Sequence, residues 1–317
     1  MKSFNEILTN TSKTNRSVLC VGIDPDPLFG SGNRILELNR IIVEATSDLA
    51  CAYKLNLAGY EAMGLNGVEI LLETINLIRT KNPDMPIIGD AKKGDIGNSS
   101  AAYSRALFDQ YKFDAVTVNP YMGYDSLEPF LERRDKGIFI LCHTSNKGGQ
   151  EIQDLMVLEN GMSEARPLFE VIASFAAKWD KYGNVGLVMG ATYPRQIGQV
   201  RKICPNMVLL IPGVGFQGGD MEETVTNAVG VNGLGFVINV SRQIMYAAKT
   251  ESGDMRAKND IVKEIRLESL RLRDQLNHHI VLFYSHCLFI KQPHLSRKNL
   301  VNILTTIPVQ VTLPVMH

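Results

Sequence analysis

The feature that most constrains the fold is an eightfold alternation of short apolar segments with longer helical patterns. The apolar segments are continuous and rich in β-branched residues, which is typical of strands buried on both faces of a parallel sheet. They occupy residues 18–24, 51–56, 86–92, 115–120, 137–144, 185–191, 207–215 and 235–242. Eight strand–helix units in about 260 residues fit a (β/α)8 barrel, or TIM barrel, in number and length. We therefore predict an α/β protein with this barrel.

A doubly wound open sheet is the competing fold. It normally has fewer strands and a glycine-rich turn after the first one, whereas the first strand here runs into Asp24-Pro25-Asp26. The segments between strands show the three- and four-residue apolar spacing of amphipathic helices. Ser3, followed by Glu6, indicates a capping box that begins a short N-terminal helix. These patterns favour the barrel.

The composition changes abruptly near the C-terminus. The chain has 317 residues, yet every acidic residue lies at or before Asp274 and every glycine at or before Gly253. So sharp a change indicates the end of a domain. We predict that residues 1–276 form the barrel and that its last helix ends near Leu276. Residues 277–317 then form a tail of uncertain structure, which we interpret as the remnant of a fusion.

Composition also excludes several classes of protein. The 33 basic and 33 acidic residues give zero net charge, which argues against binding to nucleic acid. Apolar stretches fall well short of the ~20 residues of a membrane span, and the N-terminus lacks the apolar core of a signal peptide, so we expect a cytoplasmic protein. The five cysteines show neither close pairs nor Cys/His metal spacing. We predict no disulfide framework and no metal site.

Charged residues gather at predicted strand ends, where barrels place their chemistry. Alternation along the third strand puts Asp90 and Lys92 on one side and Lys93 on the other. In the second strand, Lys54 lies inside an apolar run, with Asn56 on its face. Because an unpaired buried charge costs several kcal/mol, we predict that these lysines and carboxylates pair with one another.

Three other strand ends indicate a ligand with a phosphate and a polar ring. The seventh strand leads into a glycine-rich run at 212–220, and the eighth ends at Arg242. Barrels often bind phosphate with the loops after these strands, and arginine can form two parallel hydrogen bonds to phosphate oxygens. The fifth strand leads into Thr144 and Ser145, whose hydroxyl groups suit hydrogen bonds to a polar heterocycle.

These motifs together resemble those of the orotidine 5′-phosphate decarboxylase family. Residues 90–98, DAKKGDIGN, are similar to its D-x-K-x-x-D-I-x-N signature. Residues 52–56, AYKLN, resemble its second-strand lysine motif, and residues 212–220, PGVGFQGGD, its phosphate loop. The residues of these motifs are most similar to those of the second type of the family, which is found in many bacteria and some protists. The resemblance covers roughly residues 4–275.

The resemblance implies loss of CO2 from orotidine 5′-monophosphate to give UMP, the last step of de novo pyrimidine synthesis, with no cofactor. The catalytic array would be Lys54, Asp90, Lys92 and Asp95, with Lys92 as the proton donor to C6 of the ring. The resemblance also implies a homodimer, in which Asp95 and Ser99 complete the neighbouring site. The implied substrate contacts are Asp24 and Asn56 at the ribose, Thr144 and Ser145 at the pyrimidine, and Gly215, Gln217 and Arg242 at the phosphate.

Other functions stay open at this point. A related phosphosugar decarboxylase or aldol-type synthase of the same barrel superfamily would use the aspartates to hold Mg²⁺, and EDTA would inhibit it. A Schiff-base aldolase would use Lys54 as its nucleophile, and borohydride would trap its intermediate. A phosphate-binding barrel without catalysis would show neither behaviour.

Overall fold

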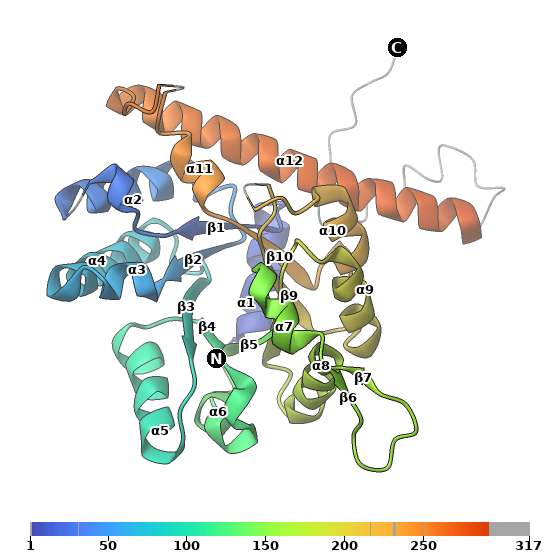
Figure 1. Cartoon of the computed structure of the whole chain (residues 1–317). Helices are drawn as coiled ribbons and strands as arrows, with labels where there is room; N and C mark the ends of the chain where they lie inside the picture. The colour runs from blue at the N-terminus through green and yellow to red at the C-terminus, as the bar shows by residue number, and fades with distance from the viewer. Residues whose placement is uncertain (1, 31, 216, 231–232, 251, 292–317) are drawn as a thin grey trace.

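Eight parallel strands close into a barrel in the structure, a computed structural model that describes residues 2–30, 32–215, 217–230, 233–250 and 252–291 (Figure 1). The strands are β1 (Leu19–Ile23), β2 (Ala52–Asn56), β3 (Ile87–Lys93), β4 (Ala115–Val118), β5 (Gly137–His143), β8 (Val185–Met189), β9 (Val208–Pro212) and β10 (Phe236–Val240). They follow one another in this order around the barrel, and β10 pairs back onto β1. Each overlaps one of the eight predicted segments, so the predicted (β/α)8 barrel is confirmed.

Helices surround the barrel in Figure 1. They are α1 (Phe4–Thr14), α2 (Asn33–Thr46), α3 (Leu57–Glu61), α4 (Gly64–Lys81), α5 (Gly97–Arg105), α6 (Tyr124–Leu131), α7 (Gln150–Gln153), α8 (Leu168–Trp179), α9 (Pro194–Ile203), α10 (Met221–Ala228), α11 (Arg242–Tyr246) and α12 (Lys258–Lys291). Shorter elements are 3₁₀ turns at Pro27–Phe29, Pro120–Met122 and Lys147–Gly149, and a π-helical turn at Ala106–Gln110. A small hairpin of β6 (Met156–Val157) and β7 (Arg166–Pro167) precedes α8, and the apolar pattern did not predict it.

The N-terminal helix α1 packs against one end of the barrel interior. It begins with the predicted capping box, in which the Ser3 amide donates to the Glu6 carboxylate at 2.7 Å and the Glu6 amide donates to Ser3 Oγ at 3.3 Å. The Phe4 ring meets Phe139 of β5 edge to face, with centroids 5.7 Å apart. A Cβ on Gly137 would lie 2.4 Å from the Phe4 ring, so glycine at this position leaves room for the helix.

Side-chain alternation divides the barrel interior into two layers. The lower layer, next to α1, is apolar and fully packed. It contains Cys20, Ala52, Ile88, Ala115, Phe139, Val208 and Val237, which form one buried cluster with Phe4 and Leu8. The upper layer lies two residues further along each strand, toward the carboxyl end. The strands therefore present their next inward-facing side chains at the barrel mouth.

The last helix does not end near Leu276, as the change in composition indicated. α12 continues to Lys291, because the apolar face of the helix continues with Ile280, which is fully buried. Asn277 donates to the carbonyl of Arg16 at 2.9 Å. Tyr284 Oη accepts from the Gly233 amide at 2.6 Å and donates to the Gly230 carbonyl at 2.9 Å. The first part of the predicted tail is thus packed on the barrel, whereas residues 292–317, with the proposed fusion remnant, lie outside the described residues.

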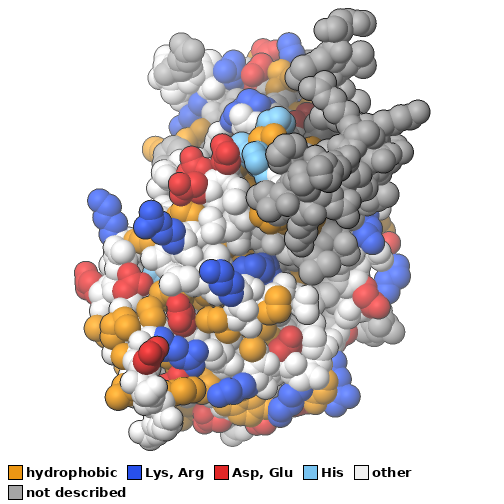
Figure 2. Space-filling view, turned by 90° about the vertical axis from the view of Figure 1, so that its right-hand side faces the viewer, with side chains coloured by type: hydrophobic (Ala, Val, Ile, Leu, Met, Phe, Trp, Pro, Cys, Tyr) orange, Lys and Arg blue, Asp and Glu red, His pale blue; other side chains and the backbone are white. Residues whose placement is uncertain are grey.

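The described part of the chain gives no sign of a metal centre or a membrane segment. It holds no group of three His, Cys, Asp or Glu side chains placed to bind a metal ion. None of its helices is long and apolar enough to cross a membrane. Cys20, Cys51, Cys142 and Cys204 are buried thiols. In Figure 2, acidic and basic side chains are interspersed over the face that is shown, with no continuous basic surface.

The packing of α12 predicts that a chain ending after Leu276 is much less stable than one ending after Lys291. The shorter chain loses the buried Ile280 side chain and the Asn277 and Tyr284 hydrogen bonds. Ile280→Ala in the full chain should lower the free energy of unfolding by about 2–5 kcal/mol. Thermal and urea unfolding of the chain ending after Leu276, the chain ending after Lys291 and the Ile280→Ala variant measures these differences in stability. An unchanged midpoint for the chain ending at Leu276 would contradict the inference and restore the predicted boundary.

Candidate active site

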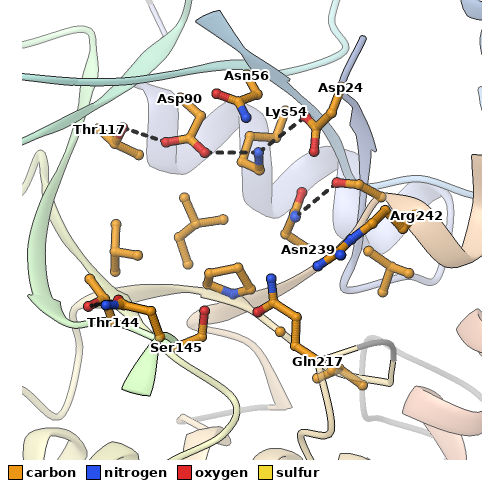
Figure 3. A pocket seen from close by; sticks show the side chains of 18 of the residues that line it. Asp24, Lys54, Asn56, Asp90, Thr117, Thr144, Ser145, Gln217, Asn239 and Arg242 are labelled. Carbon is orange, nitrogen blue, oxygen red and sulfur yellow. Dashed lines mark hydrogen bonds and ion pairs between the residues drawn. The ribbon is translucent and has the colours of Figure 1, made fainter. Parts of the chain in front are cut away.

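A cavity of about 710 Å³ opens at the carboxyl ends of the barrel strands (Figure 3). Upper-layer side chains line its base, and they differ in polarity around the barrel. The polar ones are Lys54 of β2, Asp90 of β3, Thr117 of β4 and Asn239 of β10, and the apolar ones are Leu141 of β5, Val188 of β8 and Leu210 of β9. The cavity therefore has a charged wall and an apolar wall, which suits a flat ring that carries polar substituents.

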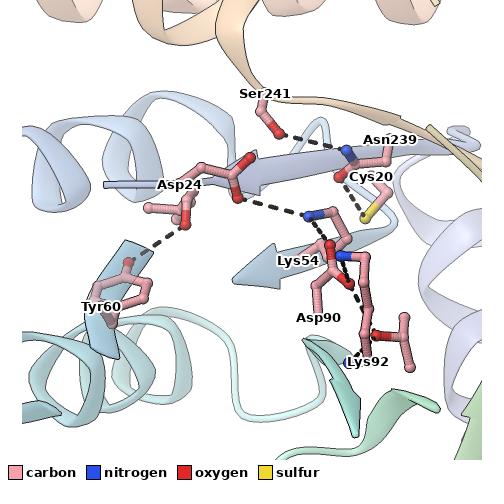
Figure 4. A network of polar contacts seen from close by, with 10 residues as sticks. Cys20, Asp24, Lys54, Tyr60, Asp90, Lys92, Asn239 and Ser241 are labelled. Atoms are coloured by element: carbon pink, nitrogen blue, oxygen red, sulfur yellow. Dashed lines mark hydrogen bonds and ion pairs between the residues drawn. The ribbon is translucent and has the colours of Figure 1, made fainter. Parts of the chain in front are cut away.

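The charged wall is a chain of ion pairs (Figure 4). Lys54 Nζ lies 3.0 Å from Asp90 Oδ2 and 3.6 Å from Asp24 Oδ1. Lys92 Nζ lies 2.6 Å from Asp90 Oδ1. The predicted pairing between the lysines and carboxylates of adjacent strands is therefore present. Lys93 points elsewhere and contacts Glu61 at 3.0 Å, as the side-chain alternation predicted.

Burial and charge oppose each other in this chain of ion pairs. Burial of Lys54 by itself would lower its pKa, but Asp24 and Asp90 outweigh that effect and raise the pKa above its ordinary value. Burial of Asp90 would raise its pKa, but Lys54 and Lys92 hold it well below the usual range. Both groups are thus ionised at neutral pH. The Lys92 side chain is half exposed to the cavity, unlike Lys54 at 5%.

The structure brings most of the predicted substrate contacts to this cavity. Asp24, Asn56, Thr144, Ser145, Gln217 and Arg242 all line it. Figure 3 shows Thr144, Ser145 and Gln217 across the cavity from the charged wall. Gly215 lies beside the cavity, in the loop after β9. Its φ of +74° suits glycine, and its amide donates to the carbonyl of Gly219 at 3.2 Å.

Asp95 and Ser99 do not line the cavity of their own barrel. Asp95 Oδ1 accepts from the Ile96 amide at 2.8 Å, at the beginning of α5. Ser99 is exposed on the first turn of the same helix. The geometry of a single chain therefore separates these two residues from the other predicted site residues.

Several cavity residues were not predicted from the sequence. Thr117 and Asn239 occupy inward-facing positions two residues after lower-layer residues of β4 and β10. The side-chain alternation that identified Asp90 would have identified Thr117 as well, because it is a polar residue inside an apolar run. Gln153 of α7 also lines the cavity, and its amide oxygen accepts from the Thr144 amide at 2.9 Å. No local pattern marks Gln153, because it lies on the short helix α7 and not at the end of a strand.

Comparison with known proteins agrees with this geometry. The model of the orotidine 5′-phosphate decarboxylase / HUMPS family matches residues 17–253, which include all eight barrel strands. The chain belongs to this family. The resemblance that the strand-end motifs indicated is therefore confirmed. A curated orotidine 5′-phosphate decarboxylase from Dehalococcoides mccartyi is 46% identical over 277 residues, covering 87% of this chain and 98% of the relative. One from Roseiflexus sp. is 43% identical and covers 87% and 97%.

Solved structures of this family share the fold. The structure of Leishmania donovani OMP decarboxylase matches with a TM-score of 0.75 at 34% identity, covering 88% of this chain and 98% of that one. The structure of Leishmania donovani UMP synthase matches with a TM-score of 0.78 at 35% identity. That match covers 89% of this chain and 57% of the synthase. The barrel described here thus corresponds to one part of the synthase chain.

The depressed pKa of Asp90 predicts a pH-dependent contribution to stability. Asp90→Asn should lower the free energy of unfolding at pH 7 by about 3 kcal/mol, the lower end of the range for a broken buried pair, since Asp24 still faces Lys54. An aspartate whose pKa is depressed by folding stabilises the protein above its unfolded pKa of about 3.9, and the contribution is lost as the pH falls toward the folded value. The difference between wild type and variant should therefore shrink below about pH 4.

Urea unfolding at pH 7 and pH 3 measures this difference. Asp109→Asn provides the control, because it removes a more exposed ion pair, with Arg133. We expect a much smaller change in that variant at either pH. A difference for Asp90→Asn that is the same at both pH values would contradict the assignment.

Proposed function

We propose that this chain removes CO2 from orotidine 5′-monophosphate to give UMP, the last step of de novo pyrimidine synthesis. The observation that carries the proposal is the Lys54–Asp90–Lys92 array at the barrel mouth of a chain that belongs to this family. The related proteins named above bear the name of this decarboxylase. Family membership favours this reaction over the aldolase and the simple binding barrel.

The arrangement of the cavity supports one orientation of the substrate. Arg242 and Gln217, which line the cavity near the loops after β10 and β9, would bind the phosphate. Asp24 and Asn56, which also line the cavity, would hydrogen-bond the ribose hydroxyl groups. Ser145, with Thr144, lies across the cavity from the charged wall, where it would meet the amide edge of the pyrimidine. The ring then lies between the apolar wall and Lys92.

Lys92 is the residue we assign to the chemical step. Loss of CO2 breaks the bond between C6 and the carboxyl carbon and leaves the electron pair on C6, in the plane of the ring. No neighbouring carbonyl accepts that pair. A fixed ammonium beside C6 stabilises the charge most in the transition state. Lys92 then transfers its proton to C6, and solvent reprotonates the amine.

Asp90 and Lys54 hold Lys92 in place before the substrate arrives. Asp90 Oδ1 contacts Lys92 Nζ at 2.6 Å, and Lys54 contacts the other carboxylate oxygen at 3.0 Å. The apolar wall of Leu141, Val188 and Leu210 offers no competing polar groups. Because such a site needs little reorganisation during the reaction, its fixed charges are more effective than the same charges in water.

The role of Lys92 predicts that Lys92→Ala lowers kcat by at least about 10³-fold, within the range for loss of a general acid together with its charge. The UMP affinity should change by only a few fold, since the phosphate and ribose contacts stay. Loss of the orotate chromophore at saturating substrate, with EDTA present, measures turnover, and calorimetry measures UMP binding. Lys93→Ala is the matched control and should keep wild-type turnover. Substantial activity in Lys92→Ala would contradict the assignment, and inhibition of the wild type by EDTA would favour the magnesium-dependent alternative.

The active unit in this proposal is a homodimer in which Asp95 and Ser99 reach the neighbouring cavity. Large apolar side chains are exposed around Asp95. Ile96 is 58% exposed and Tyr121 88% exposed, and Met122 lies next to Gly94. An exposed apolar surface of this kind commonly marks a protein–protein contact. A twofold axis through it would exchange the two Asp95 side chains between sites. A cytosolic location stays a prediction from the sequence.

Shared sites predict complementation between two inactive variants. Lys92→Ala and Asp95→Ala subunits, mixed in equal amounts and allowed to exchange, should form heterodimers with one intact site each. Random pairing would restore about one quarter of wild-type activity, because half of the dimers are mixed and each has one of two sites intact. Steady-state turnover before and after mixing measures the recovery. Exchanged dimers without any recovery would show that each chain builds its site alone.

A further inference from the structure

We propose that Thr117, at the end of β4, is a positioning residue for the decarboxylation. In this proposal its hydroxyl group orients the Asp90 carboxylate and fixes the backbone at Lys92. Thr117 is 1% exposed and lines the cavity between the charged wall and the apolar wall. The inference rests on the proposed function and adds to it a residue that does not itself exchange protons with the substrate.

An irregularity in β3 creates the need for this hydroxyl group. Gly89 of β3 pairs with Val116 of β4, but the next paired residues are Lys93 and Val118. Three residues of β3 thus lie opposite Thr117 alone, so the strand bulges. At the bulge, Lys92 has a φ of +48°, in the left-handed region that non-glycine residues seldom occupy. Its amide donates to Thr117 Oγ1 at 2.9 Å, so a side chain takes the place of a main-chain acceptor.

The hydrogen bonds of Thr117 have only one consistent direction. The Lys92 amide can only donate, so Thr117 Oγ1 accepts from it. The hydroxyl proton is then free to be donated, and Asp90 Oδ1 lies 2.8 Å away (Figure 3). Asp90 is ionised because its pKa is depressed, and it therefore accepts. One hydroxyl group thus links the backbone of the proposed proton donor to the carboxylate that holds its side chain.

Thr117 supplies a geometric constraint that the lysines do not. Lys54 and Lys92 carry their charges on long side chains, whose ammonium groups follow a rotating carboxylate. Threonine is β-branched and stiff at χ1, and its hydroxyl group is one bond from Cβ on a buried strand. The hydroxyl group therefore fixes the plane of Asp90, so that each carboxylate oxygen faces one lysine. Such preorganisation affects the transition state more than ground-state binding.

The experiment compares Thr117→Val with Thr117→Ser. Valine keeps the shape but removes the hydroxyl group, so kcat should fall about 10- to 100-fold, while the KM for orotidine 5′-monophosphate and the UMP affinity stay within about threefold. Serine keeps the hydroxyl group and should stay within a few fold of wild-type kcat. Thr11→Val is the matched control, since the buried Thr11 hydroxyl group bonds the Ile7 carbonyl in α1, at the other end of the barrel. That variant should keep wild-type kcat.

Each outcome decides the proposal. Wild-type kcat in Thr117→Val overturns it. Equal losses in the valine and serine variants, or a loss of UMP affinity parallel to kcat, would indicate a packing role and also overturn it. If the valine variant does not fold, Thr117→Ala and Thr117→Ser replace it, and a kcat gap between alanine and serine supports the role of the hydroxyl group, whereas no gap overturns it. Wild type and Lys92→Ala are measured in the same assay. An inactive wild type overturns the proposed function itself. An active wild type with unchanged kcat in Thr117→Val overturns the positioning role alone.

Discussion

The charge on Lys54 is the constraint on which the site depends. Its ammonium group lies at the boundary between the apolar lower layer and the open upper layer of the barrel, where an isolated charge would lose its proton. Two carboxylates, Asp24 directly after β1 and Asp90 on β3, keep it charged. The same interaction keeps Asp90 ionised, and Asp90 in turn holds Lys92 at the cavity. The reactive lysine is therefore placed through a buried ion pair that is complete in the free protein.

Closure of the barrel brings the other upper-layer side chains next to the Lys54–Asp90 ion pair. Parallel strands that close on themselves bring inward-facing side chains of different strands to the same end of the barrel, so residues far apart in sequence meet in the upper layer. The upper-layer side chains of β2, β3, β4 and β10 are polar or charged, whereas those of β5, β8 and β9 are apolar. The division creates a low-polarity side for the ring and a charged side for the bond that breaks. Thr117 lies where the two sides meet.

The end of the last helix shows where composition misleads. Acidic residues and glycine both stop before Leu276, but packing does not stop there. Ile280 and Tyr284 continue the helix face that contacts the barrel, and Tyr284 bonds two backbone groups of the loop before β10. A helix continues as long as its buried face does, whatever the residues on its outer face. The β6–β7 hairpin was not predicted, because strands of only two residues give no periodic signal.

Sequence alone predicted the eight strands, the barrel, and the positions of Lys54, Asp90 and Lys92, because apolar runs and side-chain alternation are local properties of the chain. It also indicated the phosphate and ring contacts, since barrels place them at known strand ends. Only the tertiary structure showed that β3 bulges opposite Thr117 and that Gln153 reaches the cavity from α7. These features depend on strand register and loop conformation, which are decided by contacts between segments distant in sequence.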